Sequence, residues 1–72
     1  MTKEELINEL QDKRVALLKE YEKTTTLMCS EIEKSDPMLY LHIVENTYKK
    51  LSALDKRIAA VSSALMALRK ID

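Results

Sequence analysis

Few side chains in this sequence could carry out chemistry, and none has a suitable partner nearby. His42 is the single histidine, and Glu45 could share its face of a helix, but one imidazole and one carboxylate make a poor metal site. Nucleophilic catalysis needs a serine, cysteine or lysine near a general base and a third group that orients the base. No such set occurs at helical spacing, so we expect His42 to lie on a solvated helix face.

The acidic residues give no sign of catalysis either. The pairs Glu4/Glu5 and Glu31/Glu33 lie among lysines, in surroundings that are typical of a solvated surface rather than of a general acid. A Gly-rich phosphate loop is impossible in a chain that has no glycine. The sequence therefore predicts no enzyme, no cofactor, no catalytic residue and no metal ligand.

Cys29 is the only cysteine, so it has no partner for an internal disulfide, which fits a reducing compartment. It follows Met28 in an apolar stretch. Because a free cysteine behaves as a small apolar residue, we expect Cys29 to be buried rather than reactive.

Composition and charge exclude further classes of function. The 12 Lys and Arg balance the 12 Asp and Glu, whereas a nucleic-acid-binding protein needs surplus cations to neutralise phosphates. No apolar run approaches the ~20 residues that span a bilayer. The acidic start, residues 1–5, differs from a signal peptide, so the chain is expected in the cytosol.

The length and the missing glycine point to long helices. A chain of 72 residues is one domain, here 1–72, and without glycine it has few tight turns. Thr2 and Glu5 form a capping box that starts a first helix, about 2–34. Three rows of apolar residues then repeat every 11 positions, which is close to the period of a straight helix: Leu6, Leu17, Met28; Leu10, Tyr21, Ile32; and Ile7, Leu18, Cys29. The β-branched run 24–26 is expected to be helical but to fray or bend.

The break between two helices lies at residues 34–37. Asp36 is predicted to cap a second helix, about 36–70, with Pro37 in its first turn. Its apolar seam, the stripe that faces the first helix, is a heptad pattern: Val44, Leu51, Ile58, Leu65 and Thr47, Leu54, Val61, Leu68.

The two stripes match in an antiparallel arrangement. Facing pairs such as Leu6 with Leu65 and Ile32 with Tyr40 have numbers that add to 71 or 72, which centres the bend on Ser35/Asp36. In this register Thr24 or Thr25 meets Thr47 in a polar layer, and the side chain of Arg14 must run outward along the seam. The predicted fold is all-α, an antiparallel, coiled-coil-like two-helix hairpin.

Some apolar surface remains outside this seam. From Ala59 to Leu68 the polar residues are Ser62 and Ser63 alone, so the segment is apolar on nearly every face. Because such a helix is normally covered, we predict that Ala60, Ala64, Met66 and Ala67 bind a protein partner. The alternative is that alanine simply favours a solvated helix. A second apolar cluster either caps the hairpin tip or adds to the binding surface: Met38, Leu39, Leu41 and Ile43.

Residues 36–68 resemble a known family. An Asp36-Pro37-x-x-Tyr40 entry leads into a long helix that contains Leu54, Ile58, Ala59, Ala60 and Val61. This layout resembles the small co-chaperones of type III secretion needle subunits, the YscE-like family. The resemblance implies a hairpin in the bacterial cytoplasm that docks onto a larger tetratricopeptide-like chaperone, and the two together keep the needle subunit monomeric. It also implies that Tyr40 and the small residues of the second helix form the docking surface.

Three other functions stay open. Needle subunits are themselves hairpins with an Asp-Pro turn, so the chain could be such a subunit. Its charged first helix and charged end, residues 69–72, favour the co-chaperone over this alternative. A self-associating hairpin could instead form a four-helix-bundle homodimer or a filament. A small phage- or plasmid-type inhibitor of another protein would show the same amphipathic hairpin.

Overall fold

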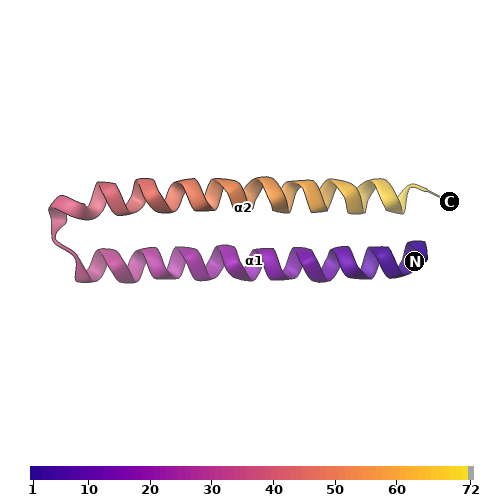
Figure 1. Ribbon diagram of the computed structural model, residues 1–72, viewed down its shortest axis with the longest axis horizontal. Coiled ribbons are helices and arrows are strands. Elements are labelled where there is room, and N and C mark those ends of the chain that lie inside the picture. Colours follow the sequence, from indigo (N-terminus) through magenta and orange to yellow (C-terminus); the bar gives the residue numbers. More distant parts are fainter. Residues whose placement is uncertain (72) are drawn as a thin grey trace.

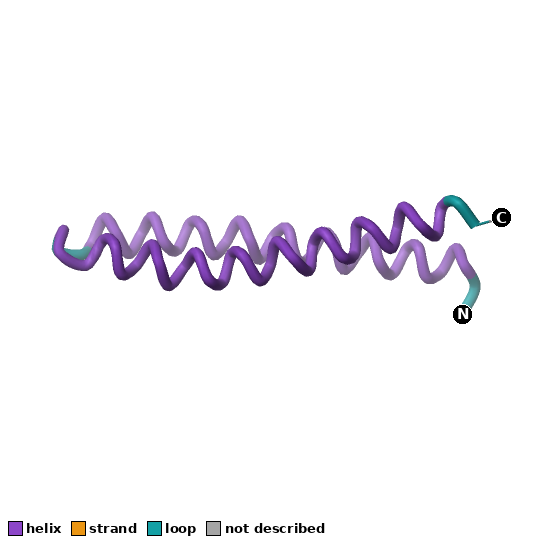
Figure 2. The backbone as a smooth tube through the Cα atoms, turned by 90° about the horizontal axis from the view of Figure 1, so that it is seen from above, coloured by secondary structure: helices purple, strands orange, loops and turns teal. Residues whose placement is uncertain are grey.

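The chain folds into two long antiparallel helices. The computed structural model describes residues 1–71, with α1 at Lys3–Lys34, a short 3₁₀ turn η1 at Pro37–Leu39, and α2 at Tyr40–Arg69 (Figure 1). The hairpin is 55 Å long and 14 Å across between Cα atoms, and both ends of the chain lie at the same end of the rod. The helices cross at a shallow angle (Figure 2), as in coiled-coil-like packing. The predicted helical hairpin is confirmed, while Asp72 lies outside the described residues.

Both predicted N-cap side chains, those of Thr2 and Asp36, accept a backbone amide. The backbone amide of Glu5 donates to Thr2 Oγ1 at 3.2 Å, and that of Met38 donates to Asp36 Oδ1 at 2.9 Å. At the other end of α1 the Ser35 amide donates to the Ile32 carbonyl at 3.2 Å. The turn that Asp36 caps is 3₁₀, so the α-helix itself begins three residues later than Pro37, at Tyr40.

The threonine run is helical. Each of the hydroxyls of Thr24, Thr25 and Thr26 donates to the carbonyl four residues earlier, at 2.8 to 3.0 Å. These bonds satisfy the hydroxyls without breaking the helix. The expected fraying is therefore wrong, because α1 runs through this segment without interruption.

The core is thin. Among residues 1–71 the buried side chains are Thr47, Leu54 and Leu65, all from α2. The two principal rows predicted for the first helix are confirmed as its inner face, since every member is half-buried: Leu6, Leu10, Leu17, Tyr21, Met28 and Ile32. Two helices cover only one side of each other, so most of the seam stays partly in contact with solvent.

The predicted seam is wrong at Val44, which is 41% exposed, while Ile43 is half-buried. A heptad row drifts by about 20° per repeat around a straight helix. Leu65 is buried, so Val44, three repeats earlier, is rotated by about 60° to the side of the seam. Ile43 takes its place against α1.

The prediction that Cys29 is buried is also wrong, because Cys29 is exposed. Its neighbour Met28 faces the seam, and successive helical residues are about 100° apart. Cys29 therefore lies on the side of the hairpin, as does Leu18 in the same row, which is 41% exposed.

The first cap offers a test of local structure. Thr2→Ala is expected to lower the free energy of unfolding by about 1 kcal/mol, because the Glu5 amide loses its acceptor. Thr2→Ser keeps a hydroxyl oxygen and should lose much less, as measured by urea unfolding followed by circular dichroism. An equal loss in both variants would show that the oxygen contributes nothing.

Candidate protein-binding surface

The polar side chains in the described part of the chain do not form a metal site. Within residues 1–71 no three His, Cys, Asp or Glu side chains are grouped so that they could hold a metal ion. His42 is exposed, as predicted, and its Nε2 lies 3.2 Å from Asn46 Nδ2. The surface is therefore best described by its apolar residues.

Large apolar side chains are exposed on both helices and at the tip. They are Met1, Val15, Leu18, Leu27, Met38, Leu39, Tyr40, Leu41, Val44, Tyr48, Met66 and Ile71. Scattered apolar residues are normal on a protein surface, but a contiguous apolar patch indicates a binding site. The arrangement of these residues around the helices therefore decides whether they form a binding site.

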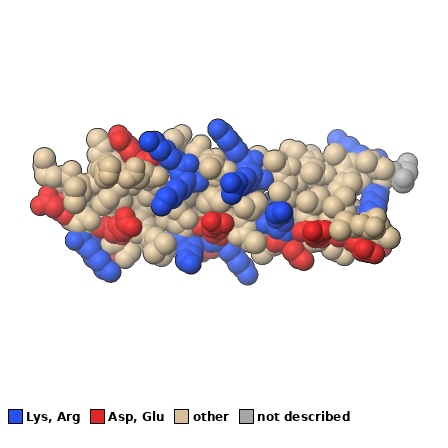
Figure 3. All heavy atoms as spheres, viewed as in Figure 1, with Lys and Arg blue, Asp and Glu red and all other residues tan. Residues whose placement is uncertain are grey.

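The C-terminal part of α2 is uncharged on its outward side. We call Ile58–Leu68 the apolar segment, because it contains no charged residue. Its predicted binding residues Ala60, Ala64, Met66 and Ala67 are all exposed. At about 100° per residue these four side chains span about 160° of the helix circumference. Figure 3 shows charged side chains of both signs over both helices on one broad face, and a stretch free of charge along α2 towards its C-terminal end.

Tyr40 lies apart from this segment. It is the first residue of α2 and is 38% exposed. It lies about 30 Å along the helix from Ala60, because each residue advances the helix by 1.5 Å. The structure thus brings together four of the five predicted binding residues and places Tyr40 near the hairpin tip.

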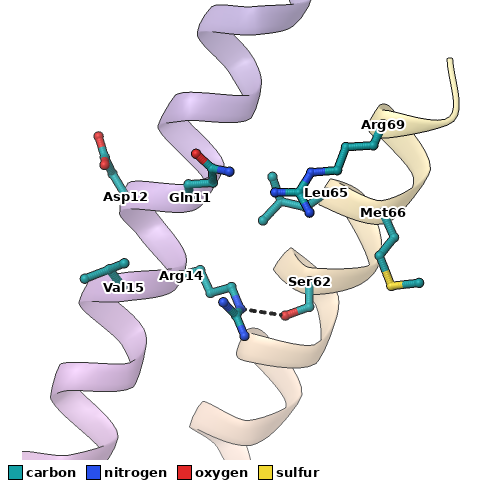
Figure 4. Close-up of a pocket in the computed structure, with 8 residues that line it drawn as sticks. All are labelled: Gln11, Asp12, Arg14, Val15, Ser62, Leu65, Met66 and Arg69. Atoms are coloured by element: carbon teal, nitrogen blue, oxygen red, sulfur yellow. Dashed lines mark hydrogen bonds between the residues drawn. The ribbon is translucent and has the colours of Figure 1, made fainter. Parts of the chain in front are cut away.

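A groove between the helices is a feature that the sequence did not reveal. Its lining residues come from both helices (Figure 4): Gln11, Asp12, Arg14 and Val15 from α1, and Ser62, Leu65, Met66 and Arg69 from α2. Arg14 Nε donates to Ser62 Oγ at 3.1 Å. Arg14 is exposed, which confirms the predicted outward path of its side chain. In Figure 4, Val15 and Met66 point outward on the two sides of the groove.

No protein-family model, curated protein or solved structure matches this chain. The resemblance of residues 36–68 to needle co-chaperones therefore stays a prediction. Over residues 1–71, neither helix combines the length and the apolar character needed to cross a membrane. An extended hairpin with exposed apolar side chains indicates a protein partner.

Proposed function

We propose that this chain is a small, non-enzymatic co-chaperone of the bacterial cytoplasm. It binds a larger tetratricopeptide-like chaperone, and the complex keeps a type III secretion needle subunit soluble and monomeric. The main support is the apolar segment Ile58–Leu68, which has no charge and exposes Ala60, Ala64, Met66 and Ala67. The resemblance of residues 36–68 supplies the class of partner.

The shape of the segment suits a helical-repeat partner. Stacked helix pairs form a concave surface, which could enclose the outward side of one helix. Alanine side chains allow a neighbouring helix to approach closely, and Met66, at 60% exposed, offers a large flexible side chain to a pocket. Tyr40 would contact the same partner only if the binding surface extended along most of α2.

The docking surface is tested by a charge in the apolar segment. We expect Ala64→Glu to weaken binding to the chaperone by at least about a hundredfold, because it buries an unpaired carboxylate in a close contact. Its helicity by circular dichroism should stay near that of the wild type, since Ala64 is exposed. Binding is measured by calorimetry with a tetratricopeptide-like chaperone, which is to be sought among the products of the neighbouring genes.

Ala53→Glu is the matched control. Ala53 is also an exposed alanine on α2, but it lies outside the apolar segment, close to Asp55 and Lys56. Equal loss of binding in both variants would contradict docking through the apolar segment. A genome neighbourhood without a tetratricopeptide-like chaperone and a needle subunit would contradict the proposed partner.

A further inference from the structure

We infer that one broad flank of the hairpin pairs with the same flank of a second copy, which gives a symmetric four-helix bundle. We call it the Leu18 flank, and its apolar members are Val15, Leu18 and Cys29 of α1 with Val44 and Tyr48 of α2. This inference goes beyond the proposed function, because it uses residues outside the apolar segment and names a different occupant.

The groove shows which side of the hairpin these residues occupy. Gln11 and Ser62 line it from the two helices (Figure 4). Leu18 follows Gln11 by two helical turns, and Tyr48 precedes Ser62 by four turns, so each continues the row of its groove residue. The same flank therefore runs from the groove towards the hairpin tip.

The Leu18 flank is more apolar than the flank opposite. Val15 is 49% exposed, Leu18 and Val44 are each 41% exposed, and Tyr48 is 69% exposed. Leu27 lies nine residues after Leu18, which is about 180° around α1, and is 54% exposed. Charged side chains occupy the rows beside Leu27, on the side of the hairpin away from Leu18: Glu9, Lys13, Glu20 and Glu31.

The size of the flank suits a second copy. A face of 55 Å by 14 Å between Cα atoms covers roughly 770 Å², and a standard interface takes about 800 Å² from each partner. Two hairpins stacked on such faces form a four-helix bundle, whose core lies between all four helices. This pairing would bury side chains that one thin hairpin leaves in solvent.

Charges near the middle of α1 also suit antiparallel pairing about a two-fold axis near Leu18. Leu18 is at the midpoint of Lys3–Lys34, so this axis brings Leu18 beside its own copy and Arg14 beside Glu22 of the second copy. Asp55, near the midpoint of α2, would meet its own copy and oppose the pairing. Asp55→Asn should therefore tighten the dimer several-fold, whereas weakening would contradict this arrangement.

The decisive measurement is sedimentation equilibrium of the full chain. We expect the wild type to be dimeric at about 10 µM, and Leu18→Glu to raise the dimer dissociation constant at least about a hundredfold, because symmetry places two carboxylates, one from each copy, in the interface. Leu27→Glu, an equal change on the opposite flank, should leave that constant within about threefold. If Leu18→Glu loses helicity, Tyr48→Glu takes its place, since Tyr48 is 69% exposed.

Three outcomes would overturn the inference: a monomeric wild type at about 100 µM, polymers larger than a dimer, or equal weakening by Leu27→Glu. The test is separable from that of the proposed function. Ala64 lies about 160° around α2 from the Ser62 row and outside the Leu18 flank. Ala64→Glu should thus leave the dimer intact, so loss of chaperone binding and loss of dimerisation are scored independently.

Discussion

Leu65→Ala is expected to unfold most of the hairpin at 25 °C. Leu65 is 4% exposed and is one of the two buried apolar residues among residues 1–71, together with Leu54. Truncating a buried leucine to alanine lowers the free energy of unfolding by about 2–5 kcal/mol. A chain of this size rarely gains more than ~3–5 kcal/mol from its core, so the loss is comparable to the whole stability.

The neighbouring residue provides the matched control. Met66 is 60% exposed, so Met66→Ala should change the free energy of unfolding by less than about 0.5 kcal/mol. Both variants are compared by thermal and urea unfolding at one protein concentration, because self-association would stabilise the folded chain. Similar stability of the two variants would contradict the packing of α2 against α1 through Leu65.

The hairpin was predictable because its signals are local and repeat along the chain. The oxygens of Thr2 and Asp36 fix where helical structure starts, and Pro37 marks the restart. Rows of apolar residues at intervals of 11 and 7 identify the face that each helix buries. Each signal depends on backbone geometry, which is the same in every helix.

The prediction errors arise where a small angular drift accumulates along a helix, or where a side chain lies at the edge of the seam. The prediction that Val44 lies in the seam was wrong because a seven-residue repeat drifts around a straight helix, and Ile43 is half-buried there instead. The prediction that Cys29 is buried was wrong because apolar character does not bury a residue on the side of a two-helix hairpin, where the other helix does not cover it. At Thr24–Thr26, low helix propensity was outweighed by packing, since Thr24 and Thr25 are half-buried.

The candidate site was predictable only in part, for a similar reason. The apolar segment is continuous in the sequence, so the exposure of Ala60, Ala64 and Ala67 followed from composition and helical spacing. The groove joins Val15 and Ser62, which are far apart in the chain. Its lining depends on the register and the crossing of the helices, which a single repeat pattern does not specify.

The continuity of α1 can be tested at its weakest point. Thr25→Pro is expected to lower the free energy of unfolding by about 3 kcal/mol or more. Proline has no amide hydrogen, and its ring clashes with the carbonyl of Tyr21. In the wild type that carbonyl also accepts a hydrogen bond from the Thr25 hydroxyl at 3.0 Å. For a domain of this size each kcal/mol corresponds to about 4–8 °C, so the midpoint should fall by more than about 12 °C.

Thr25→Ala separates the backbone effect from the loss of the side chain. Alanine removes the half-buried threonine side chain but has a higher helix propensity, so we expect its midpoint to stay within about 5 °C of the wild type. Thermal unfolding followed by circular dichroism measures both variants. If the midpoints of the proline and alanine variants differed little, α1 would already be broken at this point. In that case α2 would lack a continuous surface against which Leu54 is buried.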